Sequence, residues 1–96
     1  MDILKTFLTS DLVDFALFQW PEEFHRAPMI GEEIESKGFF IGKDMETFRK
    51  ASLTVSRVVH THNGMDVYLN LSEEQTHDGW QILIHEKKTG RVYKNS

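Results

Sequence analysis

The chain contains no cysteine and only two prolines among its 96 residues. Without thiols it cannot form disulfides, thiolate zinc sites or a cysteine nucleophile. It also has no apolar run long enough to span a bilayer as a helix. The apolar N-terminal segment is interrupted by Asp2, Lys5, Asp11 and Asp14, and it lacks the basic start and the cleavage site of a signal peptide. We therefore expect a cytoplasmic protein with no membrane segment.

The sequence also lacks a concentrated cluster of basic residues. It contains eleven basic and fifteen acidic residues, and the formal net charge is −4. Nucleic-acid binders neutralise phosphates and therefore usually carry a basic patch or stripe. The densest basic cluster here consists of Lys87, Lys88, Arg91 and Lys94. The sequence thus disfavours nucleic-acid binding, and any such activity would depend on these four residues.

The length and composition suit one globular domain over residues 1–96. The chain is 40% hydrophobic and 27% charged, which is ordinary for a protein with a packed core. No internal repeat, low-complexity segment or Gly/Ser/Pro-rich linker divides it. We expect a single hydrophobic core.

Two conformations remain open for the first twenty residues. Ile3, Leu4, Phe7 and Leu8 share a helical stripe, which favours a short helical or irregular lead-in over a short strand. Residues 12–20, LVDFALFQW, are rich in β-branched and aromatic types and stop at a proline, which favours a strand. A buried helix that begins at residue 10 is the alternative.

The next segment predicts two short strands and a short helix. "EEIES" is expected to form one strand, Lys37–Gly38 a turn, and "FFIG" another strand. "KDMETFRKA" is expected to form one or two helical turns capped by Asp44. Met45, Phe48 and Ala51 would then face inward.

The strongest local signal is a hairpin around Asn63-Gly64. This pair separates two alternating apolar runs, which is typical of a two-residue type I′ turn. Such a loop sets His62 opposite Met65 and His60 opposite Val67. Val58 would share that face of the sheet, and Val55 would lie on the other face.

The C-terminal part predicts a second hairpin. "SEEQTHDG" is a polar loop, the run "WQILIHE" alternates like a strand, and "KKTG" turns the chain into "RVYK". The fold class expected from all segments is mainly β: a small SH3-like or bent-sheet barrel of five or six short strands with one or two short helices. The segment APMIGEEIESKGFFIG resembles the way in which many SH3-like barrels begin a strand, a likeness of architecture only.

His60 and His62 are the candidate metal ligands. Residues i and i+2 of a strand point to one side, so both imidazoles could reach one ion. A catalytic zinc or iron site needs a third protein ligand. No second half-motif supplies one, although the chain offers His25, His77, His85, Asp66, Glu32 and Glu33. We favour ordinary hairpin residues and no cofactor; a metal-binding protein or metal-dependent enzyme is the alternative prediction.

No catalytic motif accompanies the histidines. The serines lack a Gly-x-Ser-x-Gly context, and the glycines form no phosphate-binding loop. The loop "PEEFHRAP" combines Glu22, Glu23, His25 and Arg26, which could form a general-base pair but is more typical of an exposed contact loop. We lean against an enzyme.

Aromatic residues exceed what a compact barrel needs. Seven Phe, two Trp and two Tyr are present, and aromatics left outside a core often form recognition patches. Phe39 and Phe40 would point to opposite faces of a strand, so one ring needs cover from residues 44–51 or from a second subunit. We therefore predict a non-enzymatic interaction module that binds a protein partner or self-associates, with its contact residues at Phe24, His25, Arg26, Phe39 and Phe40.

Overall fold

The computed structural model describes residues 4–24, 26–42, 44 and 46–93. This part of the chain is mainly strand, so the predicted mainly β, bent-sheet fold class is confirmed. Its elements in chain order are β1 (Leu4–Thr9), the 3₁₀ turn η1 (Phe15–Leu17), β2 (Glu23–Phe24), β3 (Glu33–Glu35), β4 (Phe39–Ile41), β5 (Phe48–Arg49), β6 (Ser52–Thr61), β7 (Gly64–Asn70), α1 (His77–Thr89) and β8 (Arg91–Tyr93). Within these residues no helix has both the length and the apolar character needed to cross a bilayer.

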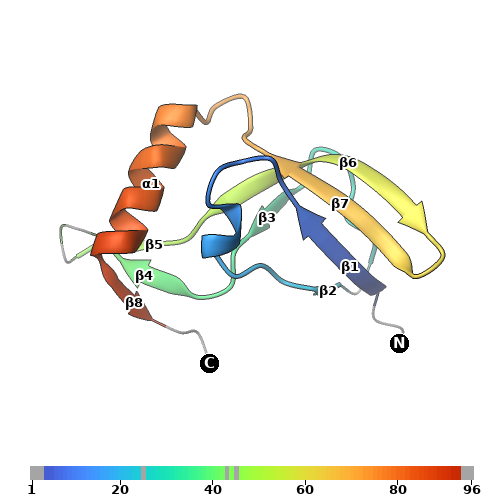
Figure 1. Cartoon of the computed structure of the whole chain (residues 1–96), viewed down its shortest axis with the longest axis horizontal. Coiled ribbons are helices and arrows are strands. Elements are labelled where there is room, and N and C mark those ends of the chain that lie inside the picture. Colours follow the sequence, from blue (N-terminus) through green and yellow to red (C-terminus); the bar gives the residue numbers. More distant parts are fainter. Residues whose placement is uncertain (1–3, 25, 43, 45, 94–96) are drawn as a thin grey trace.

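Two sheets organise these strands. A five-stranded sheet has the order β2-β1-β7-β6-β3, and a three-stranded sheet has the order β5-β4-β8. β1 pairs with β7 in parallel, and every other described strand pair is antiparallel. Figure 1 shows the curl of the large sheet, with the tip of the β6–β7 hairpin at one end of the molecule and α1 beside the small sheet at the other.

The β6–β7 hairpin is present, but its register differs from the predicted one. Thr61 pairs with Gly64, so the loop residues are His62 and Asn63, and His60 lies opposite Met65 instead of Val67. Gly64, at φ 146°, has positive φ, whereas Asn63 does not, so the predicted type I′ turn is wrong. The displacement equals two residues, which is one full period of a strand, and therefore His60, Val58 and Val67 keep a common face.

A β-bulge in β6 overturns the predicted position of Val55. The ladder shifts between Val55 and Arg57, which leaves Ser56 as the extra residue, and its hydroxyl donates to the Tyr68 carbonyl at 3.1 Å. One extra residue reverses the alternation of side chains. Val55 consequently joins Val67 in the core instead of facing away from it.

The core fills the space between the large sheet, the small sheet and α1. The largest fully buried side chains belong to four strand residues, Phe40, Leu53, Val55 and Val67. Trp80 and Ile84 of α1 are buried in the same cluster. Since these residues are far apart in the chain, the core depends on long-range pairing.

The N-terminal predictions need two corrections. Residues 4–9 form a strand instead of the favoured helical lead-in, because they pair with β7 from Thr6–Met65 to Thr9–Tyr68. Residues 12–20 form neither a long strand nor a buried helix. The chain turns through Asp14, whose φ of 56° is left-handed, and continues through η1 to the buried Phe18.

The predicted helix over residues 44–51 is wrong. The Asp44 carboxylate caps a turn, accepting from the Glu46 and Thr47 amides at 3.1 and 3.0 Å. The chain then enters β5, which pairs with β4, and Phe48 is 65% exposed instead of facing inward. Ala51 is buried as predicted, and Met45 lies outside the described residues.

The predicted second hairpin is also wrong in its first strand. Residues 77–89 form α1, and the Thr76 hydroxyl caps it by accepting from the Gly79 amide at 3.0 Å. Trp80 and Ile84, four residues apart, share its buried side, while Ile82 is 59% exposed. "RVY" does form a strand, β8, but it pairs with β4.

Gly90 tests the junction of α1 and β4. A Cβ at this position would lie 2.3 Å from the Ile41 carbonyl oxygen and 2.8 Å from the Glu86 carbonyl oxygen. We expect Gly90→Ala to lower the free energy of unfolding by about 1–3 kcal/mol, because backbone atoms must move to admit the methyl group. Urea unfolding measures this change. His85→Ala, on the exposed side of α1, is the control; equal midpoints for the two variants would contradict the assigned junction.

Candidate functional site

A cleft between β1 and residues 15–23 is the candidate binding site. Its volume is about 420 Å³, and its walls are mainly apolar and aromatic. The described lining residues are Thr6, Phe7, Leu8, Phe15, Ala16, Phe18, Trp20, Pro21, Glu22 and Glu23. The sequence folds this way because β1 continues beyond the end of its pairing with β2, which leaves an edge for the connecting segment to flank.

β1 and the short strand β2 set one end of the cleft. In the described part of the chain β2 pairs with Leu4 and Lys5, and the Thr6 amide then donates to the Glu22 carbonyl at 3.0 Å. Beyond this hydrogen bond the two segments separate. Thr6 is buried, Leu8 packs against the core, and Phe7 is 51% exposed.

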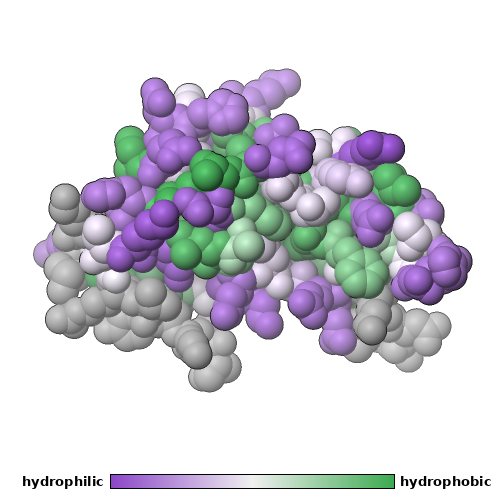
Figure 2. Space-filling model, in the orientation of Figure 1, coloured by the Kyte–Doolittle hydropathy of each residue, from purple (hydrophilic) through white to green (hydrophobic). Residues whose placement is uncertain are grey.

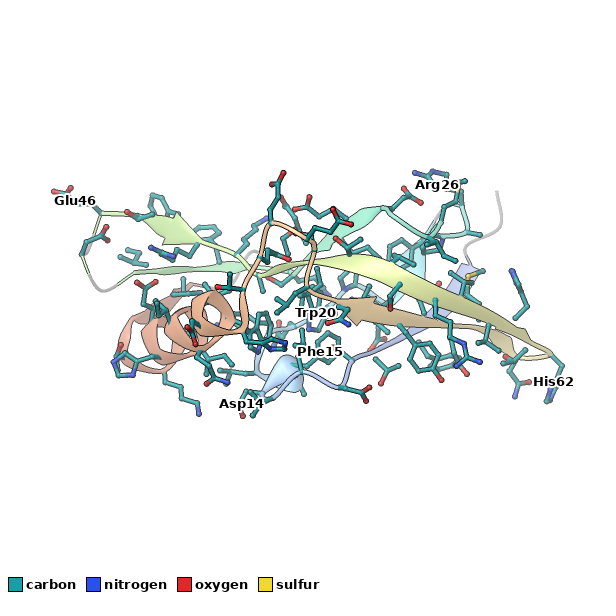
Figure 3. The ribbon with its side chains drawn as sticks, turned by 90° about the horizontal axis from the view of Figure 1, so that it is seen from above. Asp14, Phe15, Trp20, Arg26, Glu46 and His62 are labelled. Carbon is teal, nitrogen blue, oxygen red and sulfur yellow. The ribbon has the colours of Figure 1, made fainter. Side chains whose placement is uncertain are left out.

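Stacked aromatic rings form the opposite wall. The rings of Phe15 and Trp20 lie 4.9 Å apart with an interplanar angle of 12°, and the Trp20 indole N–H donates to the Phe15 carbonyl at 3.0 Å. Figure 3 shows the two residues together near the middle of the molecule. The buried Phe18 contacts both Trp20 and Trp80, at 6.5 and 5.3 Å between ring centroids. The wall is thus continuous with the core.

α1 holds this wall in place from the other side. The Trp80 indole N–H donates to the Val13 carbonyl at 2.8 Å, and the Lys88 ammonium pairs with the Asp14 carboxylate at 3.1 Å. These two contacts fix the turn that leads into η1. A left-handed conformation at a residue such as Asp14 costs free energy, and surrounding contacts of this kind are what maintain it.

The electrostatic character of this cleft differs from that of three other clefts in the described part of the chain. Glu22 and Glu23 are both exposed, and the described lining residues include no lysine, arginine or histidine. The three other clefts that we compare are each lined by at least one basic residue: Arg26 in the first, Arg49 and Lys50 in the second, and Arg57 and His77 in the third. The cleft beside β1 therefore combines carboxylates and aromatic rings without a described cation.

The four predicted contact residues that the structure describes do not form one surface. Phe24 and Arg26 line a separate cleft of about 160 Å³ on the side of β3, and His25 lies outside the described residues. Phe39 and Phe40 belong to the other sheet. Phe40 is 1% exposed, so it is a core residue. Phe39 packs edge-on against Phe48 at 5.1 Å, so residues 44–51 do provide the predicted cover, although as a strand.

His60 and His62 are not among the described residues that line the cleft, and only His60 lies on a strand. His60 is exposed on β6, and His62 follows the end of that strand, at the hairpin tip in Figure 3. No group of three His, Cys, Asp or Glu residues suited to a metal ion occurs in the described part of the chain. A metal site at these histidines stays a prediction with no third ligand among the described residues.

Two of the four candidate nucleic-acid contacts interact with other residues of the chain. Lys88 pairs with Asp14, and the Lys87 ammonium lies 5.4 Å from the centroid of the Phe40 ring. Partial burial lowers the pKa of Lys87. Lys94 lies outside the described residues.

Sequence patterns single out neither Phe15 nor Trp20 as lining a cleft, and they relate Glu22 and Glu23 only to His25. The available signal was the dense aromatic run that ends at "WPEE". Comparison with known proteins adds no relative, since no family model, curated protein or solved structure matches the chain.

Arg26 and Glu32 allow a pH test of the neighbouring cleft. Hydrogen bonds from the Arg26 guanidinium and then from the Met29 amide lower the pKa of Glu32 from 4.5 to about 2. A lowered folded-state pKa means that this pair supports the fold above pH 4.5 and loses that support as the pH falls toward 2. We expect Arg26→Gln to move the Glu32 titration midpoint, followed by NMR of its carboxyl carbon, upward toward 4.5. Arg57→Gln should leave that midpoint unchanged, and an unshifted midpoint in Arg26→Gln would refute the pairing.

Proposed function

We propose that this protein is a small, non-enzymatic interaction module that binds a protein partner through the cleft beside β1. One observation carries the proposal: an open, aromatic-walled cleft of about 420 Å³ that is continuous with the core. Concave, mainly apolar sites of this size with a few polar groups are typical of binding sites. A cytoplasmic location and an SH3-like type of barrel remain expectations from the sequence.

Exposed apolar residues beside the cleft support a macromolecular partner. Phe7 and Val13 are both more than half exposed, and Leu17 of η1 is exposed as well. Figure 2 shows hydrophobic residues extending across the middle of this face, with hydrophilic residues around them. Aromatic anchors within a polar rim supply much of the free energy at protein interfaces. A second copy of the chain is the alternative occupant.

The chemistry of the lining supports binding over catalysis. Among the described residues that line the cleft, the titratable side chains are Glu22 and Glu23, and the one hydroxyl belongs to the buried Thr6. Covalent catalysis needs a nucleophile beside a base, and these residues offer no such pair. Recognition needs only the shape, the rings and the charge that are present.

Paired threonine variants test the proposal. We expect photo-crosslinking in a lysate of the source organism to trap one protein on the wild type and on Phe48→Thr. With Phe7→Thr the yield should fall about tenfold, as for the loss of an interface anchor. Both positions are exposed phenylalanines on strands, but only Phe7 lines the cleft.

Light scattering on the same three proteins identifies self-association. A dimer that dissociates only in Phe7→Thr makes the partner a second copy. A monomer whose crosslinks are identical in Phe7→Thr and Phe48→Thr would overturn the proposal.

A further inference from the structure

We infer that the cleft beside β1 accepts a cationic side chain, lysine or arginine, from a basic segment of the partner protein. The inference rests on the proposed binding function and adds the chemistry of the occupant. It combines three properties of one site: carboxylates without a described counter-charge, accessible aromatic rings and a rigid wall.

The first property is negative charge without a described counter-charge. Glu22 and Glu23 lie where β2 meets β1, and neither pairs with a side chain that the structure describes. Lys5 lies opposite Glu23 in the strand register, and its side chain is outside the described part of the chain. In the neighbouring cleft, by contrast, Glu32 is already paired with Arg26. The net charge of −4 adds to the attraction for cations.

The second property is the aromatic lining. The faces of aromatic rings carry partial negative charge, and tryptophan attracts cations most strongly. The chain itself uses this pairing elsewhere: Arg57 and Lys87 each lie 5.4 Å from a ring centroid, over Tyr68 and Phe40. Phe15 and Trp20 offer comparable rings in a cleft whose described lining has no cation.

The third property is a wall that is already ordered. The indole hydrogen bond to the Phe15 carbonyl and the contact of Trp20 with the buried Phe18 fix the stacked rings. A preformed wall does not have to be ordered on binding, which reduces the cost of association. The stacked rings are therefore in place before a ligand binds.

The same geometry selects against an uncharged apolar side chain. Such a side chain could fill the apolar part of the cleft, but it would cover Glu22 and Glu23 without compensating their charge, which is unfavourable. Lysine and arginine satisfy both parts, because their aliphatic stems can pack beside Leu8 and Pro21 while the charged group reaches the carboxylates.

NMR titration with short peptides tests the inference. The peptides are Gly/Ser sequences that differ only at a central position, which holds arginine, its neutral analogue citrulline, or norleucine. The two tryptophans serve as reporters, since Trp20 lines the cleft and Trp80 is buried in the core. We expect the arginine peptide to shift the Trp20 indole resonance, to bind about tenfold more tightly than citrulline, and to weaken as salt rises from about 50 to 500 mM.

Two double variants separate a local contact from a general effect of charge. We expect E22Q/E23Q to weaken arginine-peptide binding about tenfold, as for the loss of a charge-assisted contact. E73Q/E74Q removes the same charge from an adjacent, exposed pair outside the cleft and should bind like the wild type. An unchanged Trp80 resonance confirms that each variant is folded.

Three results would contradict the inference. Equal affinity for the arginine and citrulline peptides, equal weakening in the two double variants, or no shift of Trp20 would overturn the inference. If partner capture is still lost in Phe7→Thr in any of these cases, the cleft binds a partner of other chemistry and the proposed function stands. If Phe7→Thr captures the partner like the wild type, the proposed function fails independently.

Discussion

The parallel pairing of β1 with β7 is the constraint on which the binding cleft depends. It places the start of the chain inside the large sheet, with β7 on one side and only the short β2 on the other. Because β2 returns antiparallel to the first residues of β1, the connection between them must run back along the outer edge of β1. That connection carries Phe15 and Trp20, so the topology itself creates a cleft with a strand on one side and aromatic rings on the other.

Local patterns in the sequence predicted the parts of the fold that depend on neighbouring residues. Strands β3 and β4 and the β6–β7 hairpin follow from alternation and turn residues. Strict alternation along β6 does not predict the bulge at Ser56, which places Val55 on the core face together with Val67. The apolar residues of "WQILIHE" fit both the two-residue period of a strand and the 3.6-residue period of a helix. The Thr76 cap and the burial of Trp80 stabilise the helix. The pairings β1–β7 and β4–β8 join distant segments and leave no local signal.

The position of the cleft could not be predicted from the sequence. A surplus of aromatic residues correctly suggested that some rings lie outside the core, as Phe7 and Phe48 do. The turn through Asp14 determines which rings line the cleft. No local sequence pattern predicts the left-handed conformation of Asp14. The fold also separates Phe24 from Phe39 by placing them in different sheets. The long-range topology therefore separates residues that the sequence analysis assigns to one contact set.

The attachment of the η1 turn to α1 has a consequence for biosynthesis. The turn that leads into the wall of the cleft is held by groups that come much later in the chain: the Trp80 indole lies 67 residues after Val13, and the Lys88 ammonium lies 74 residues after Asp14. β7, which β1 needs as a partner, is also synthesised after the wall. During translation the nascent chain must therefore carry Phe15, Phe18 and Trp20 without their final neighbours until α1 has been made.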